Sequence, residues 1–339
     1  MKLYGGIDLH SNNSVIVLLD EEDQKVYQRR IGNDLKTILD ALEPYGDSIE
    51  GLAVESTYNW YWLVDGLMEA GYRVHLVNTA AVKQYEGMKY GNDHTDAHWL
   101  AHLLRLGILP KGYIYPKEER AVRDLLRKRG QLVQMRTTNL LSVQTLITRN
   151  TGSSLSANKV KKLQSEQVAE LLPCEDTALA VNSNLNIMQA LQEQIKILEK
   201  EVQKKAKLKA EYAALQTVPG IGFILALTIL LETGPVQRFA KIGNYASYCR
   251  CVGTTRLSNG KQKGKGNAKN GNRYLSWAFI EATNFAIRYN DNIKAYYQRK
   301  QAKTNRVVAI KTVAHKLARA CYYILRDQVE FDLSKAFSA

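Results

Sequence analysis

Leu3-Tyr4-Gly5-Gly6-Ile7-Asp8-Leu9 and Ser14-Val15-Ile16-Val17-Leu18-Leu19 are two apolar runs, separated by the polar His10-Ser11-Asn12-Asn13. Apolar, β-branched runs bounded by turn-forming residues favour two neighbouring strands. Lys25 to Ile31 predicts a third strand after them. One carboxylate, Asp8, lies inside the first run, where an acid without a charged partner is costly.

Strand and helix signals alternate from there to about residue 110. Asn33 is the predicted cap of a helix with Leu35, Ile38, Leu39 and Leu42 on one face, ending at Pro44. The further elements expected are a strand at Ile49 to Val54, a helix from Trp60 to Met68, a strand at Arg73 to Val77, and helices near 79–88 and 94–107. Three consecutive strands followed by this alternation predict a mixed sheet with helices packed on it, not an all-parallel sheet.

The rest of the chain is predicted to be mostly helical. Lys117 to Asn150 form one long basic helical pattern. A second stretch carries Met188, Leu191, Ile195, Leu198 and Val202 at spacings of three and four, which favours a coiled coil or helical hairpin, with a plain bundle helix as the alternative. Glycine turns and a lysine-dense loop follow from about Leu215. We therefore predict three domains, at residues 1–110, 111–212 and 213–339.

Charge divides unevenly between these parts. The 339 residues hold 47 Lys and Arg against 33 Asp and Glu, a net charge of +14. Residues 1–110 hold 9 against 16, a net of −7, so the remainder, with 38 against 17, carries +21. This split predicts a polyanion-binding part attached to an acidic one. The sequence has no apolar stretch of about 20 residues, which excludes a membrane-spanning protein. It has only four cysteines and no signal-like N-terminus, which excludes a secreted scaffold and favours the cytoplasm.

Four acids of the N-terminal part are candidate ligands of Mg²⁺. Asp8 lies on the first strand, Glu55 directly follows another, and Asp93 and Asp96 share one face at the start of a helix. If the two strands are neighbours, the helix end could bring all four together, and carboxylate oxygens suit Mg²⁺. Taken singly, Asp93 could be a helix cap and Glu55 a strand end. His94, His98 and His102, four residues apart, leave a zinc site as a further alternative.

Two basic features mark the last third. Val218-Pro219-Gly220-Ile221-Gly222 before an apolar helix predicts a helix-hairpin-helix, whose glycines and helix N-terminus could approach a DNA phosphate, although a structural turn is the alternative. Arg256 to Arg273 hold six basic residues and no acid, and their glycines and asparagines predict a mobile loop without helix or regular strand. The predicted nucleic-acid contacts are Gly220, Gly222, Arg256, Lys261, Lys263, Lys265, Lys269 and Arg273, with Arg120, Arg123 and Arg127 from the long basic helix.

Ser258 lies at the head of the basic loop. A serine becomes a nucleophile only with a base or metal beside it, and the sequence places neither there. On chemistry alone Ser247, Thr254, Thr255 and Ser276 are equally eligible.

Taken in order, these motifs resemble the DEDD-type insertion-sequence transposases of the one-ten family. The marks are Gly6-Ile7-Asp8-Leu9-His10, Val54-Glu55-Ser56-Thr57, Asp93-His94-Thr95-Asp96-Ala97, Val218-Pro219-Gly220-Ile221-Gly222, Ser258-Asn259-Gly260-Lys261 and Lys269-Asn270-Gly271-Asn272-Arg273. The resemblance covers nearly the whole chain. The sequence departs from the family pattern at Asn92, where a basic residue is common, and at Asn259, where glycine often follows the serine.

The resemblance implies an RNase H-like (RuvC-like) domain whose quartet Asp8, Glu55, Asp93 and Asp96 binds Mg²⁺. It implies that Ser258 attacks DNA to leave a phosphoserine linkage, in a bacterial, nucleoid-associated dimer or tetramer whose active site is shared between protomers. It also implies a guide (bridge) RNA that pairs with donor and target DNA.

Three other functions remain open from the sequence. The first is a metal-dependent nuclease or junction resolvase that uses water as nucleophile. The second is an actin-like or sugar-kinase ATPase, because Gly6-Ile7-Asp8 before a polar turn also opens that fold. The third is a non-catalytic DNA- or RNA-binding protein.

Overall fold

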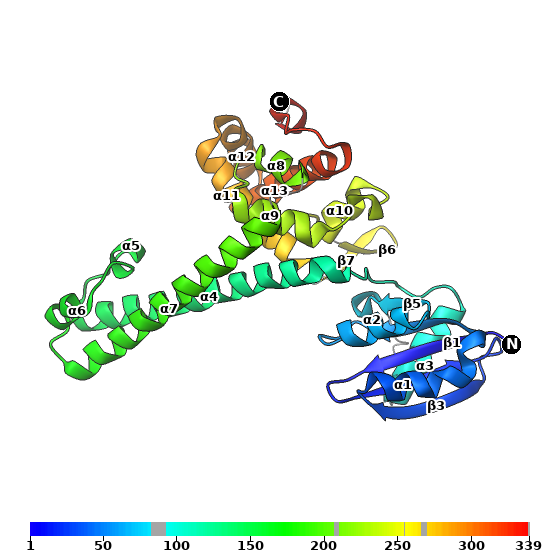
Figure 1. The fold of residues 1–339 in the computed structure, drawn as a ribbon. Coiled ribbons are helices and arrows are strands. Elements are labelled where there is room, and N and C mark those ends of the chain that lie inside the picture. Colours follow the sequence, from blue (N-terminus) through cyan, green and yellow to red (C-terminus); the bar gives the residue numbers. More distant parts are fainter. Residues whose placement is uncertain (83–92, 207–209, 254, 266–269, 338–339) are drawn as a thin grey trace. The chain divides into compact units, whose positions relative to one another are not determined.

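The computed structural model describes residues 1–82, 93–206, 210–253, 255–265 and 270–337. The chain divides into two compact units, Met1–Lys117 and Glu118–Ala339. Within the described residues, the first unit holds a five-stranded sheet and the second is largely helical with a two-stranded sheet (Figure 1). None of the described helices is long and apolar enough to cross a lipid bilayer.

The sheet of the first unit is mixed, as the sequence predicted. Its strands lie in the order β3-β2-β1-β4-β5. β2 pairs antiparallel with both β1 and β3, whereas β4 runs parallel to β1 and β5. Short turns join the first three strands and helices precede β4 and β5, which is what these two kinds of pairing require. The strands are β1 (Leu3–Leu9), β2 (Asn13–Leu19), β3 (Lys25–Gly32), β4 (Ile49–Glu55) and β5 (Val74–Val77).

Helices cover both faces of this sheet. On β2, Ile16 and Leu18 pack on the face covered by α1 and α2, whereas Val15, Val17 and Leu19 pack on the face covered by α3. Because successive side chains of a strand point to opposite faces, a strand covered on both sides reads as a continuous apolar run. The helices are α1 (Leu35–Leu42), α2 (Tyr61–Glu69) and α3 (Asp93–Arg105). This arrangement is compatible with an RNase H-like domain.

The predicted strands are confirmed within one residue at each end. The predicted cap of α1 is wrong: Asp34, not Asn33, accepts the hydrogen bond from the Thr37 backbone. Asn33 instead accepts from the Ser14 hydroxyl and donates to the His10 carbonyl, which ties β2 to the turn after β1. Of the helix predicted near 79–88, the structure shows a short 3₁₀ turn at Thr79–Ala81, and 83–92 lie outside the described residues.

The second unit begins with an antiparallel helical hairpin of α4 (Lys117–Thr151) and α7 (Glu175–Ala206) (Figure 1). Arg129 pairs with Glu199. Arg136, seven residues later on α4, donates to Gln192, seven residues earlier on α7, as antiparallel helices require. A helical hairpin is one of the arrangements that the apolar spacing of the sequence favoured. Two short helices connect them, α5 (Ala157–Val160) and α6 (Ser165–Leu171).

The C-terminal part of this unit is a helical bundle around α13. Tyr245, Phe279 and Leu317 are fully buried in its core. Its helices are α8 (Ala210–Gln216), α9 (Phe223–Thr233), α10 (Ile242–Tyr248), α11 (Arg273–Tyr289), α12 (Asp291–Lys303), α13 (Arg306–Asp327) and α14 (Leu333–Phe337).

The basic stretch after α10 contains regular strands, so the prediction that it has none is wrong. β6 (Thr255–Ser258) and β7 (Lys261–Lys265) pair antiparallel, with Ser258 opposite Lys261. Asn259 and Gly260 form the turn with φ of 50° and 71°. Two successive residues of positive φ match the right-handed twist of a hairpin, and Asn-Gly is the preferred pair.

Candidate active site

A row of side chains crosses the sheet of the first unit on the face that α3 covers. Arg30 on β3 pairs with Val15 on β2, and Val15 pairs with Asp8 on β1. β1 and β4 continue the row, because Ile7 is opposite Val54 and the next residues are Asp8 and Glu55. Asp8 and Glu55 therefore meet at the carboxyl ends of two adjacent parallel strands, as the sequence predicted.

α3 brings the other two acids to this row through a close approach to β1. A Cβ atom at Gly6 would lie 1.9 Å from the carbonyl oxygen of Ala97 and 2.7 Å from the backbone nitrogen of Ala101. Only glycine lets the helix backbone pack this near the strand. Asp93 and Asp96 stand in the first turn of α3, so this contact sets where both carboxylates reach the strand ends.

Electrostatic interactions link three of the four carboxylates, those of Glu55, Asp8 and Asp96. Burial raises the pKa of Glu55 to about 8, helped by its hydrogen bond to Asp8 and by the negative charges of Asp8 and Asp96. Asp8 itself is only 3% exposed. Carboxylates packed this closely repel one another and favour either a shared proton or a cation.

His10 and Arg30 are two further residues of the cluster, and the sequence did not single them out. His10 Nε2 lies 3.1 Å from Asp8 Oδ2 and 3.3 Å from Asp93 Oδ2. The Arg30 guanidinium lies 2.6 Å from Asp93 Oδ2, and this contact is the main reason that the pKa of Asp93 is lowered. Asp8, His10 and Asp93 each offer a ligand atom, and these atoms lie within 4.8 Å of one another.

The residues fit a divalent metal. The donors are mostly carboxylate oxygens, which hard divalent cations prefer. A cation among them would relieve the repulsion that raises the pKa of Glu55. Asp8, Asp93 and His10 form the one group of three candidate ligands within the described residues.

The three histidines of α3 do not form a zinc site in this structure. His102 Nδ1 lies 2.8 Å from Asp23 Oδ1, where Arg105 also binds. His94 Nδ1 contacts the Gln28 amide at 3.0 Å. The rings of His98 and His102 stack 6.4 Å apart. These contacts tie α3 to the β2–β3 edge and its turn, which is a structural role.

In the second unit, Ser258 is exposed at the end of β6, beside the turn to β7. Lys261 and Lys263 on β7 are exposed as well. The hairpin thus carries an exposed hydroxyl and two exposed ammonium groups, with Lys261 directly opposite Ser258 in the ladder. The side chains of Arg256 and Lys265, and the whole of Lys269, lie outside the described residues.

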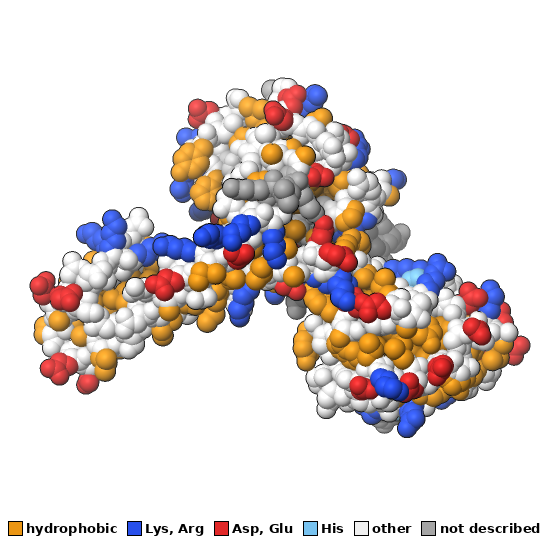
Figure 2. Space-filling model, in the orientation of Figure 1, with side chains coloured by type: hydrophobic (Ala, Val, Ile, Leu, Met, Phe, Trp, Pro, Cys, Tyr) orange, Lys and Arg blue, Asp and Glu red, His pale blue; other side chains and the backbone are white. Residues whose placement is uncertain are grey.

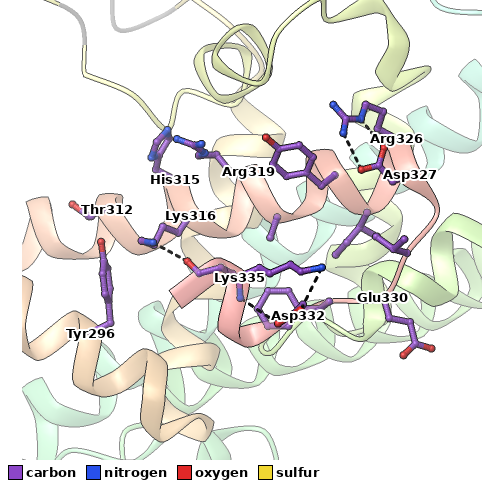
Figure 3. Close-up of a pocket in the computed structure, with 16 residues that line it drawn as sticks. Tyr296, Thr312, His315, Lys316, Arg319, Arg326, Asp327, Glu330, Asp332 and Lys335 are labelled. Carbon is purple, nitrogen blue, oxygen red and sulfur yellow. Dashed lines mark hydrogen bonds and ion pairs between the residues drawn. The ribbon is translucent and has the colours of Figure 1, made fainter. Parts of the chain in front are cut away.

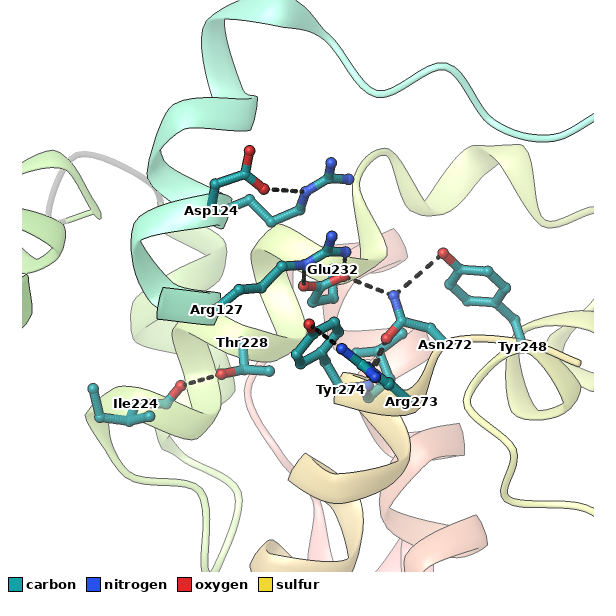
Figure 4. A network of polar contacts seen from close by, with 11 residues as sticks. Asp124, Arg127, Ile224, Thr228, Glu232, Tyr248, Asn272, Arg273 and Tyr274 are labelled. Carbon is teal, nitrogen blue, oxygen red and sulfur yellow. Dashed lines mark hydrogen bonds and ion pairs between the residues drawn. The ribbon is translucent and has the colours of Figure 1, made fainter. Parts of the chain in front are cut away.

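A polar network fixes the segment that leaves this hairpin (Figure 4). The Glu232 carboxylate, 2% exposed, accepts two hydrogen bonds from Arg127 at 2.6 and 2.7 Å and one from the Asn272 amide at 2.7 Å. Asn272 caps α11 by accepting from two backbone N–H groups of its first turn. One residue earlier, the Gly271 carbonyl accepts from Arg250 at 2.8 Å. The network therefore links α4, α9 and α11 where the hairpin segment returns to the bundle.

Several residues that the sequence predicted as nucleic-acid contacts are buried or contact other parts of the protein instead. Arg120 and Arg123 are 4% and 8% exposed, so they are buried, and Arg127 is partly exposed but pairs with Glu232. The close approach at Gly220 is to α11, because a Cβ there would lie 2.2 Å from the Ala282 carbonyl. Gly222 stands free at the N-terminus of α9, and Arg273 is exposed at the start of α11.

Comparison with known proteins identifies the family. A model of DEDD transposases of the IS110 family matches residues 5–150, and a model described as "Transposase IS116/IS110/IS902 family" matches residues 212–298. A probable family 20 transposase of Pseudomonas aeruginosa is 25% identical over 283 residues, 78% of this chain and 80% of that protein. The transposase for insertion sequence element IS1111A of Coxiella burnetii is 22% identical over 292 residues, 85% of this chain and 78% of that protein. The chain therefore belongs to the IS110 family of insertion-sequence transposases and is a DNA transposase.

Proposed function

We propose that this transposase cuts and rejoins DNA through Ser258, assisted by Mg²⁺ held by Asp8, Glu55, Asp93 and Asp96. The observation that carries the proposal is the meeting of Asp8 and Glu55 where β1 and β4 end. The first turn of α3 brings Asp96 near Glu55 and Asp93 near Asp8. We assign residues 1–110 to the metal-binding domain, 111–212 to the helical segment and 213–339 to the serine-bearing domain.

Mg²⁺ supplies Lewis-acid stabilisation of the phosphate oxygens when bound. Asp8, the most buried of the acids, and Glu55 would hold it from the strands, and Asp93 and Asp96 would hold it from the helix. Arg30 orients Asp93 through its 2.6 Å contact. His10 lies between Asp8 and Asp93, where its ring can bind a phosphate oxygen.

Ser258 provides the attacking oxygen. Its Oγ forms a bond to a DNA phosphorus, the bond from that phosphorus to a deoxyribose oxygen breaks, and the serine proton passes to the leaving oxygen. Attack of a hydroxyl from another DNA end on the phosphoserine reverses the step and joins the strands. Lys261 and Lys263 bind the flanking phosphates, and the acids of one protomer serve the serine of another in a dimer or tetramer.

Recognition of sequence is assigned to a guide RNA that pairs with donor and target DNA. The basic excess of residues 111–339, 38 Lys and Arg against 17 acids, supports binding to phosphate backbones. A protein that delegates sequence choice to base pairing needs shape and backbone contacts more than base contacts. The protein would then act in the bacterial cytoplasm, at the nucleoid.

A denaturing gel tests the serine step. Full-length protein is incubated with Mg²⁺, guide RNA and DNA carrying a labelled strand. Wild type is expected to give a covalent protein–DNA band, Ser258→Ala none, and Thr255→Ala, on the same strand, a band like that of wild type. An equal band from Ser258→Ala, or no band from wild type, contradicts the mechanism.

The same gel separates the nuclease alternative, in which water is the nucleophile and the acids act alone. That reaction cleaves DNA without a covalent band, and its rate is unchanged in Ser258→Ala.

A further inference from the structure

Cationic side chains line several hollows of the second unit, and these hollows differ in whether the cations have partners within the protein. In the hollow of about 740 Å³ between α13 and the C-terminal segment, Arg326 pairs with Asp327 and Lys335 with Asp332 (Figure 3). Lys316 of the same hollow donates to the Ala336 carbonyl. In the hollow beside α4, Arg127 is held by Glu232 (Figure 4). These four cations are held by groups of the protein itself, whereas Arg319 of the first hollow is exposed.

The hollow of about 660 Å³ between α11, α12 and α13 is different. Arg288, Lys294 and Arg306 line it, one from each helix, and all three are exposed. None of the three has an acidic partner within 4.0 Å in the part of the chain that the structure describes. Three cations without acidic partners, against the single carboxylate of Glu281 in the wall of the same hollow, create a field that attracts an anion.

Exposed aromatic rings stand at the same place. Phe285, in the wall of this hollow, is 44% exposed, and Tyr289 one turn later is 75% exposed. Their rings are parallel within 9°, with centroids 6.4 Å apart, and the Arg288 guanidinium lies 6.0 Å from the Tyr289 centroid. Figure 2 shows hydrophobic and basic side chains next to each other on this helical part of the chain. Large exposed aromatic groups beside cations mark a binding surface.

Charge indicates the kind of partner. Residues 273–327, from α11 to the end of α13, hold 11 Lys and Arg against three Asp and Glu. Such a surface repels a basic protein and favours a polyanion. A polyanion that also offers flat, apolar faces to aromatic rings is a nucleic acid with unpaired bases.

We propose that the hollow between α11, α12 and α13 binds a single strand of nucleic acid, with Phe285 and Tyr289 stacked on unpaired bases and Arg288, Lys294 and Arg306 on the adjacent phosphates. A duplex keeps its bases stacked on one another, so its interior faces are closed to these rings. The site lies apart from Ser258 and the four acids in the sequence, and it does not depend on the serine mechanism.

The test uses full-length protein and fluorescence anisotropy with a labelled single-stranded RNA, a single-stranded DNA of the same sequence, and the matching DNA duplex. Stacking on aromatic side chains contributes about 1–3 kcal/mol per base. Phe285→Leu with Tyr289→Leu is therefore expected to weaken single-strand binding at least about tenfold. The change in duplex affinity is expected to stay within about twofold. The ratio of RNA to DNA affinity tells which strand the site prefers.

Three controls sharpen the result. Phe285→Tyr with Tyr289→Phe keeps both ring faces and is expected to bind within about twofold of wild type. Arg306→Gln is expected to weaken binding and to reduce the slope of log affinity against log salt concentration by about 0.7. Arg326→Gln removes a cation that is paired with Asp327, so it is expected to change neither the affinity nor this slope.

Equal single-strand affinity of wild type and the leucine pair overturns the proposal, as does an equal loss in the aromatic swap. A changed oligomeric state of the leucine pair in light scattering, with unchanged oligonucleotide affinity, also overturns it and assigns the face to a protein contact. Because both rings are exposed, the variants are expected to keep the wild-type circular dichroism melt.

Discussion

The carboxyl group of Glu55 is hydrogen-bonded to Asp8 where β4 and β1 end side by side. Two acids on adjacent parallel strands cannot both be ionised at low cost unless a cation lies between them, and without a cation one of them keeps its proton. Burial and the charges of Asp8 and Asp96 raise the pKa of Glu55 to about 8, so the metal-free protein holds a proton there at neutral pH.

The raised pKa makes the metal-free protein less stable in alkali. The unfolded chain loses the Glu55 proton near the ordinary glutamate pKa of 4.5 and the folded chain near 8. This contribution to stability is therefore full below the lower value and disappears as the pH rises through the upper one. After allowance for solvent screening of this half-buried group, we expect the free energy of unfolding to fall by about 1 kcal/mol as the pH rises from ~5 to ~8. Glu55→Gln removes this slope. Thermal melts in a chelator across that range check it, and a slope equal to that of wild type contradicts it.

Metal binding at pH ~7 is expected to release close to one proton, because the ligand Glu55 must ionise. Calorimetric titration with Mg²⁺ in two buffers of different ionisation enthalpy measures this number. At pH ~9 the release disappears.

Asp93→Asn is expected to weaken binding about tenfold or more. Asp40→Asn, an exposed acid paired with Lys36, serves as the control and keeps wild-type affinity. Proton release that is the same at both pH values argues against Glu55 as a ligand.

Replacing Gly6 by alanine separates α3 from β1. The added Cβ meets the Ala97 carbonyl and the Ala101 nitrogen, both backbone atoms that cannot rotate away. We expect a loss of about 3 kcal/mol in the stability of the first unit and weaker Mg²⁺ binding, since Asp93 and Asp96 move with the helix. Gly32→Ala on β3 is the matched control, because no atom lies within 4 Å of its Cβ. Equal urea midpoints for the two variants refute this account.

The architecture of the first unit could be predicted because its signals are local. Runs such as 15–19 are apolar throughout, as a strand covered on both faces must be, and the order of strands and helices then limits the pairing. The meeting of Asp8 and Glu55 follows from that pairing. His10 and Arg30 were missed because their partner Asp93 is 83 and 63 residues away in sequence. The row Arg30, Val15, Asp8 could have been read only with the β2–β3 register in hand.

The second unit shows where composition misleads. A basic helix predicts a nucleic-acid surface, but burial depends on which helix packs against which face, so Arg120 and Arg123 are buried and Arg127 meets Glu232. In the basic stretch, the many glycines led to the prediction of a loop, although the pair Asn259-Gly260 is the usual signal of a β-hairpin turn. The unpaired cations of α11, α12 and α13 stand in separate helices, and their convergence is a property of the tertiary fold.

Loss of the Glu232 charge tests the network behind the serine hairpin. Glu232→Gln leaves the Arg127 guanidinium without its buried counter-charge, which costs about 3–5 kcal/mol. We expect a lower urea midpoint for the helical circular dichroism signal, and faster tryptic cleavage at Lys261 and Lys263, because the Asn272 end of the hairpin segment loses a charged anchor. Glu201→Gln, which breaks an exposed pair with Lys204 on α7, is the control and is expected to behave as wild type. If the Glu232 and Glu201 variants unfold and are cleaved alike, Glu232 does not hold the hairpin.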